Sequence, residues 1–145
     1  MPRLFYELRL TGATQDAFGR MILIAERDRN VRELEQHFLE RAGFSVEFAD
    51  DGSVALTRSR LALPQLVITE ILIPKLDGLQ LCRDLKQDPT TRDIPVIVFS
   101  VLAAEARAKE AGANAFLRKP LVPSVLVGTI QRLVALEAHS LTESQ

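Results

Sequence analysis

From Met21 onward, short apolar runs alternate with longer segments whose apolar residues recur at helical spacing. This alternation is typical of repeated strand and crossover-helix units, and the chain contains five of them. The predicted strands cover residues 21–25, 45–48, 66–69, 96–99 and 116–117. Parallel strands joined by right-handed crossovers need helices on both faces of the sheet. We therefore predict an α/β fold built on an open, doubly wound parallel sheet.

Helical periodicity fills the intervals between the strands. Asp28 is a suitable N-cap for the first helix, and Gly43 lies where that helix should stop. The last helix is the clearest, because one apolar stripe runs along it from Val122 to Val134. The remaining helices are predicted over residues 53–60, 79–87 and 103–111.

The 145 residues are enough for one ordinary globular domain. We divide the chain into an N-terminal extension (1–20), the five-unit domain (21–138) and a polar tail (139–145). Within the extension, residues 4–10 alternate enough to form a strand, and an irregular arm is the other reading.

Composition excludes several classes of protein. The single cysteine, Cys82, rules out a disulfide framework and a cysteine-rich zinc site, and we expect it in the core. A net charge of -1 gives no global attraction to nucleic acid or to an acidic membrane. Because no apolar run is long enough to span a bilayer and the first ten residues do not resemble a signal peptide, we expect a soluble cytoplasmic protein.

Open parallel sheets bind ligands beyond the carboxyl ends of their strands. The residues that follow the predicted strands at that edge are polar: Glu26, Arg27, Glu70, Ser100 and Lys119. Topology therefore predicts one charged site made by residues that are far apart in the sequence. Each of these side chains could also be a plain solvated strand end, and we prefer the site because five polar residues coincide.

Several motifs, in order, resemble the receiver domain of bacterial two-component response regulators, in particular the single-domain chemotaxis receiver. The resemblance covers residues 21–138. It implies a flavodoxin-like fold with strand order 2-1-3-4-5. The matching stretches are Ile22-Leu23-Ile24-Ala25-Glu26-Arg27-Asp28, Ala49-Asp50-Asp51-Gly52, Leu66-Val67-Ile68-Thr69-Glu70, Asp77-Gly78-Leu79, Ile94-Pro95-Val96-Ile97-Val98-Phe99-Ser100 and Phe116-Leu117-Arg118-Lys119-Pro120.

In that family an aspartate after the third strand accepts a phosphoryl group from a histidine kinase, and two acids after the first strand hold Mg²⁺. By position, Ser100 resembles the hydroxyl and Lys119 the ammonium that contact the phosphoryl oxygens. Phe116 resembles the aromatic switch residue, although a core phenylalanine is about as good a reading. The resemblance also implies a cis peptide bond at Lys119-Pro120.

The sequence departs from the family pattern at the positions that bind the metal and accept the phosphoryl group. Glu70 stands at the phosphoacceptor position, and Arg27 stands where the second metal carboxylate is expected. An arginine has no lone pair for a metal, so we expect no specific Mg²⁺ site and no cofactor. Counting charges, we expect Arg27 to replace the ion and to pair with Glu70, with its guanidinium fork on the carboxylate. The longer glutamate would then occupy phosphoryl space and hold the site near one state.

The favoured hypothesis is a non-enzymatic, atypical receiver that binds a protein partner, a kinase or an effector, without aspartate phosphorylation. The alternative is a Mg²⁺-dependent receiver that is phosphorylated at or near Glu70. A small-molecule binder is a third reading, which the absence of a glycine-rich phosphate loop disfavours. The family's partner face comprises the fourth helix, fifth strand and fifth helix. Compared with typical receivers, residues 101–111 are about one helical turn shorter, so this face should differ in shape. The sequence is compatible with either a monomer or a homodimer.

Overall fold

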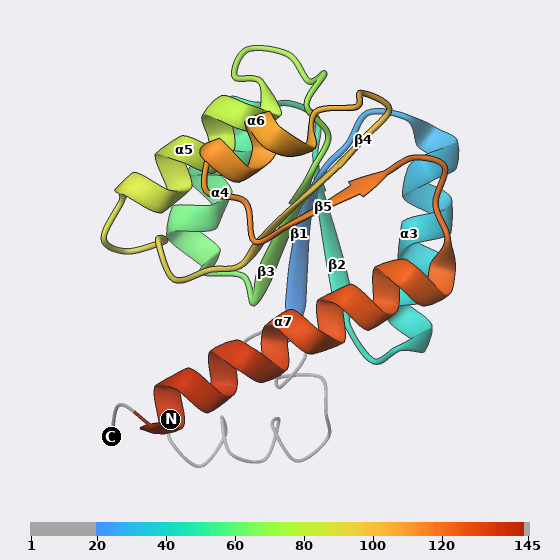
Figure 1. Ribbon diagram of the computed structural model, residues 1–145. Coiled ribbons are helices and arrows are strands. Elements are labelled where there is room, and N and C mark those ends of the chain that lie inside the picture. The colour runs from blue at the N-terminus through green and yellow to red at the C-terminus, as the bar shows by residue number, and fades with distance from the viewer. Residues whose placement is uncertain (1–19, 144–145) are drawn as a thin grey trace, which may run out of the picture.

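The computed structural model describes residues 20–143. Five strands form one parallel sheet in the order β2-β1-β3-β4-β5 (Figure 1). The predicted doubly wound sheet and its strand order are therefore confirmed. The strands are β1 (Met21–Ala25), β2 (Ser45–Ala49), β3 (Leu66–Thr69), β4 (Val96–Ser100) and β5 (Ala115–Arg118).

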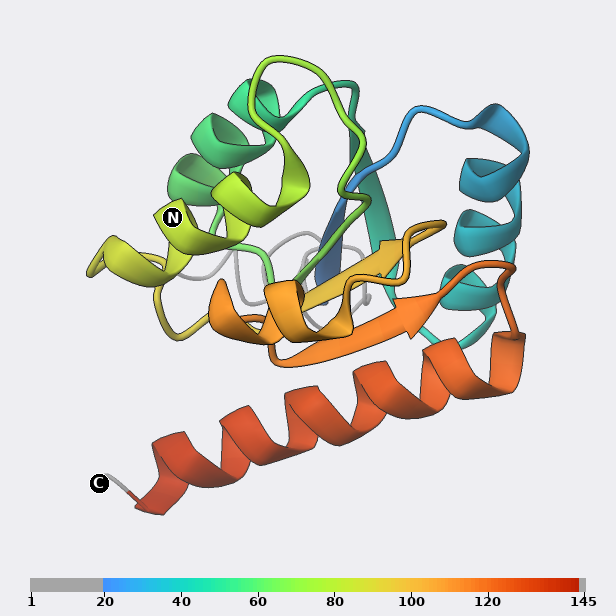
Figure 2. The same cartoon turned by 45° about the horizontal axis from the view of Figure 1, so that its top comes forward.

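Helices cover both faces of the sheet, as Figure 2 shows from a second direction. One face carries α3 (Arg29–Arg41) and α7 (Pro123–Glu143). The other face carries α4 (Gly52–Ala62), α5 (Gly78–Gln87) and α6 (Glu105–Glu110). Asp28 is the N-cap of α3, as predicted, and its side chain accepts hydrogen bonds from the backbone of Asn30 and Val31.

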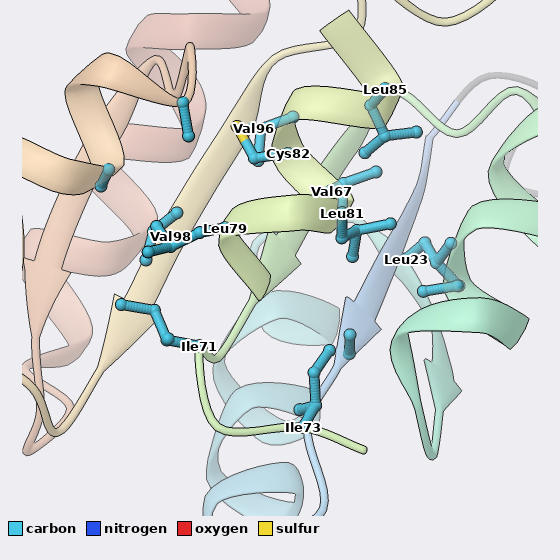
Figure 3. Packing of buried hydrophobic residues seen from close by; sticks show 14 of the residues in the cluster. Leu23, Val67, Ile71, Ile73, Leu79, Leu81, Cys82, Leu85, Val96 and Val98 are labelled. Carbon is cyan, nitrogen blue, oxygen red and sulfur yellow. The ribbon is translucent and has the colours of Figure 1, made fainter. Parts of the chain in front are cut away.

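Successive residues of each strand point to opposite faces, so every strand contributes to two cores. Leu23 and Val67 pack under α4 and α5, together with Cys82, which is fully buried as expected (Figure 3). Ile24 and Ile68 pack on the other face under α3 and α7. Burial of each such side chain is worth about 1.5–3 kcal/mol, and this burial holds the strand ends in place.

Two helices differ from the sequence prediction. The last helix continues to Glu143 and so crosses the boundary we placed at residue 138. α6 is confined to Glu105–Glu110, because its N-cap residue, Ala104, has no side-chain acceptor for the first free N–H groups. The candidate strand at residues 4–10 lies outside the described residues. Among residues 20–143, no helix is both long enough and apolar enough to cross a membrane.

Candidate functional site

Four of the five residues predicted to meet at the carboxyl edge of the sheet do so. Strand pairing aligns Ala25 with Thr69, and the backbone N–H of Glu70 donates to the carbonyl of Ala25 at 3.0 Å. On the other side, the N–H of Lys119 donates to the carbonyl of Ser100 at 2.8 Å. These backbone bonds extend the ladders by one residue and bring Glu26, Glu70, Ser100 and Lys119 together. We call these four residues the acid pocket.

The Glu70 carboxylate is 5% exposed and has donors on both of its oxygens. Oε1 accepts from the Ser100 hydroxyl and from the backbone of Ile71 at 2.6 Å and Leu72 at 3.3 Å. Oε2 accepts from the backbone of Val101 at 3.1 Å and from Lys119 Nζ at 3.0 Å. Burial alone would raise the pKa of Glu70, but the Ser100 and Lys119 contacts outweigh it and hold the pKa below its usual range.

Lys119 supplies the positive charge of the acid pocket. Its side chain is 10% exposed, and Nζ lies 2.7 Å from Glu26 Oε1 and 3.0 Å from Glu70 Oε2. The ammonium also lies 5.6 Å from the centre of the Phe99 ring. Burial opposes the charged form, yet hydrogen bonds to the two carboxylates raise the pKa of Lys119 above its usual value. The Lys119-Pro120 peptide bond is cis, as the resemblance implied.

Glu26 is held by Asp28, the N-cap of α3, and by Arg32 on α3. Its second oxygen accepts from the backbone of Asp28 at 3.0 Å. Arg32 donates from Nε to the carbonyl of Glu26 and from Nη2 to the carbonyl of Ala49 at 3.2 Å and the carboxylate of Asp50 at 2.6 Å. Arg32 thus ties α3 to the ends of β1 and β2. We did not single it out from the sequence, because its partners are mostly backbone carbonyls that no motif identifies.

A glycine allows the loop after Glu70 to close. At Gly78, the first residue of α5, an added Cβ would lie 2.1 Å from the carbonyl oxygen of Glu70, well inside van der Waals contact. The N–H of Gly78 also donates to the carbonyl of Ile71 at 3.0 Å. The Asp77-Gly78 motif therefore presses α5 against the acid pocket and caps the helix at once.

The expected pairing of Arg27 with Glu70 is wrong. Arg27 is exposed and makes no hydrogen bond or ion pair within residues 20–143. The physical reason is the pleat: Glu26 continues the extended backbone of β1, with its N–H bonded to Ala49 at 3.3 Å, and points inward. The next side chain therefore points outward. The partner of Glu70 is Lys119.

The residues of the acid pocket do not fit a bound Mg²⁺. Both carboxylates are already bonded to the Lys119 ammonium, and the side chain of Asp28 caps α3. Across residues 20–143 no group of three histidine, cysteine or acidic side chains is placed to hold a metal. Mg²⁺ prefers near-octahedral oxygen ligands, which this arrangement does not offer.

The candidate switch aromatic lies in the sheet. Phe116 lies in β5, is half-buried and packs against the core under α5 and α6, which suits either a packing switch or a plain core residue.

Glu35 is a buried acid that our sequence analysis missed. It lies on α3, is 0% exposed and has no hydrogen-bond partner on either oxygen within the described part of the chain. The signal was present, because Glu35 falls four residues after Val31 and four before Leu39, on the apolar stripe of the helix. A charged residue on the apolar stripe of a helix predicts a buried charge even when no motif includes it.

The sheet order and the position of the acid pocket agree with the resemblance to receiver domains. The profile of the response regulator receiver domain matches residues 22–131. The chain belongs to this family and is a receiver domain of two-component signalling.

Individual relatives agree with this assignment. Response regulator PleD of Caulobacter vibrioides is 34% identical over 118 residues, which are 79% of this chain and 26% of PleD. The signal receiver domain of a histidine kinase from Syntrophus aciditrophicus has a TM-score of 0.76 at 36% identity, covering 81% of this chain and 91% of that one. Chemotaxis response regulator CheY4 of Vibrio cholerae has a TM-score of 0.73 at 25% identity, covering 79% and 98%. The chain thus spans about a quarter of PleD.

Proposed function

We propose that this chain is an atypical receiver that acts by binding a protein partner, without accepting a phosphoryl group at residue 70. One observation carries the proposal. The Glu70 carboxylate already accepts hydrogen bonds from the Ser100 hydroxyl and the Lys119 ammonium. These are the two groups that the family resemblance assigns to the phosphoryl oxygens. An internal carboxylate therefore takes the contacts that the resemblance assigns to a phosphoryl group.

The charge of the acid pocket supports the same conclusion. Glu26 and Glu70 bring two negative charges and Lys119 brings one positive charge, so the pocket is already net negative. Arg27 adds nothing there, because its side chain points to solvent. A phosphoryl donor is itself anionic, and nothing among these residues would offset its charge as Mg²⁺ does in the family.

Glu70 is also a poor nucleophile in this geometry. Both of its oxygens are bonded, Oε1 to Ser100 and Ile71 and Oε2 to Val101 and Lys119. An attack on a phosphoryl donor would first have to give up some of these bonds, each worth about 1.5–3 kcal/mol when one partner is charged. The pocket therefore favours a fixed conformation over chemistry, and we propose no enzymatic activity for the chain.

A protein partner completes the proposal, and we place it on the face made by α6, β5 and α7. Val122, just before α7, and Val125, in its first turn, are 51% and 49% exposed, and Arg118 is exposed at the end of β5. Exposed apolar side chains beside a cation are suited to a protein interface. The cytoplasm, where receivers meet kinases and effectors, is the compartment this proposal implies.

The test is the mass of the intact protein immediately after incubation with acetyl phosphate and Mg²⁺. We expect no change in mass for the natural sequence. A gain of one phosphoryl group mapped to Glu70 would contradict the proposal and establish the Mg²⁺-dependent alternative.

A matched variant makes a negative result informative. Replacing Arg27→Asp and Glu70→Asp together restores two short carboxylates, leaves Lys119 and Ser100 in place, and frees the donors now used by Glu70. We expect this double variant to gain one phosphoryl group under the same conditions, which shows that the reagents and the fold permit the reaction.

A further inference from the structure

Glu35 is the one fully buried acidic side chain among the described residues that has no hydrogen-bond partner. It lies in the interface between α3 and the sheet, where Leu39 from the same helix packs with Ile22 and Ile24 of β1. An ionised carboxylate without a partner in such surroundings is costly, and the group neutralises instead by holding a proton.

Glu35 also lies within the electric field of the acid pocket. Burial is the largest cause that raises the pKa of Glu35, to about 8, and the negative charge of Glu26 raises it further. The positive charges of Lys119 and Arg32 act in the opposite direction. Lys119 is held by Glu26 and Glu70, and Arg32 by backbone carbonyls and Asp50, so neither cation makes a bond to Glu35.

β2 and α7 also pack against α3. On β2, Glu47 is paired with Leu23 of β1 on the opposite face of the sheet, and its carboxylate forms an ion pair with Arg58 of α4 at 2.7 Å. On α7, Arg132 is exposed and Glu137 is half-buried. None of these four groups forms a hydrogen bond or ion pair with Glu35.

We propose that Glu35 is a proton-binding group built into the interface between α3 and the sheet, uncharged at neutral pH while α3 is docked and ionised when α3 moves and water reaches it. α3 also carries Arg32, which holds the carbonyl of Glu26. Loss of the proton would therefore loosen Arg32 as well, and through it the position of Glu26 in the acid pocket. This link does not depend on whether Glu70 accepts a phosphoryl group.

The sign of the pH effect follows from the direction of the shift. An acid whose pKa is higher in the folded state than in the unfolded chain contributes its stability in full below the unfolded value, here 4.5. That contribution is lost as the pH rises from 4.5 to about 8. Across this window the unfolding equilibrium constant should grow about tenfold per pH unit from Glu35 alone.

The experiment compares urea unfolding of the full chain between pH 5 and pH 9 in the natural sequence and in Glu35→Gln. The glutamine variant cannot ionise, so the difference between the two curves should grow from pH 5 to about pH 8, level off above it, and favour the variant at high pH. Glu33→Gln, an exposed position on the same helix, serves as the control and should follow the natural sequence. Parallel curves for Glu35→Gln and the natural sequence would overturn the proposal.

A direct titration keeps the proposal falsifiable if the glutamine variant does not fold. The carboxyl ¹³C signal of Glu35 should titrate far above the range of ordinary glutamates, and Glu26→Gln should lower its midpoint by removing a repelling charge. Hydrogen exchange of α3 amides, corrected for intrinsic rates, should speed up over the same pH range. A Glu35 midpoint near 4.5 would contradict the account.

Discussion

The end of β5 and the end of β1 each present a cation at the same edge of the sheet, with opposite outcomes. Lys119, after β5, is buried and bonded to two carboxylates. Arg27, after β1, is exposed and has no partner within residues 20–143. The difference comes from the alternation of side chains along the strands. After β1 the inward position is taken by Glu26, so Arg27 points outward, whereas Arg118 takes the outward position at the end of β5, so Lys119 points inward. Position at the edge selects a candidate, and side-chain direction decides its role.

We expect Lys119→Met to have the largest effect on stability. The variant removes the ammonium and leaves Glu26 and Glu70 buried without their cation. Removing one partner of a buried ion pair costs about 3–5 kcal/mol, and we expect a loss of that size in urea unfolding at pH 7. The loss should shrink as the pH falls and the carboxylates take up protons. Lys109→Met, at an exposed position on α6, is the control, and an equal loss in both variants would contradict our assignment.

Glu70→Gln tests the carboxylate side of the same ion pair. We expect a loss of about 2 kcal/mol at pH 7, because one charged acceptor with several donors becomes a neutral amide. The pKa of Glu70 lies below 4.5 in the folded protein, so its contribution is present above pH 4.5 and is lost as the pH falls below it. The fall in stability toward low pH should therefore be shallower in the variant. Glu40→Gln, exposed on α3, should keep the steeper acid limb of the natural sequence.

Arg27→Gln should have the smallest effect on stability, in contrast to Lys119→Met. An exposed side chain without a partner contributes little, so we expect the free energy of unfolding to change by no more than about 0.5 kcal/mol. The same urea experiment measures it. A loss as large as that of Lys119→Met would mean that Arg27 serves the acid pocket after all.

The fold was predictable from the sequence because the local signals agree. Strand 66–69 consists of apolar and β-branched residues, Asp28 caps α3, and Gly43 follows its end. Parallel topology then forces the residues after the strands to one edge, which is enough to predict that Glu70, Ser100 and Lys119 meet.

What the sequence left open is the direction of each side chain and the contribution of the backbone. The predicted pairing of Arg27 with Glu70 was wrong, because counting charges ignores the alternation of side chains between the two sides of a strand. The N–H groups of Ile71 and Val101 that hold Glu70 carry no sequence signature. The sequence places Glu35 on the apolar stripe of its helix. Its lack of a hydrogen-bond partner depends on which groups fill the surrounding interface, and only the tertiary structure shows that.

The central claim is that the Lys119 ammonium, and neither a metal nor Arg27, is the cation that pairs with both buried carboxylates of this receiver. A crystal structure of the protein grown in a high concentration of MgCl₂ tests it most directly. The account predicts Lys119 Nζ between Glu26 and Glu70 at hydrogen-bonding distance from both, with the Arg27 side chain in solvent. A magnesium ion coordinated by Glu26, with Lys119 displaced from Glu70, would contradict it.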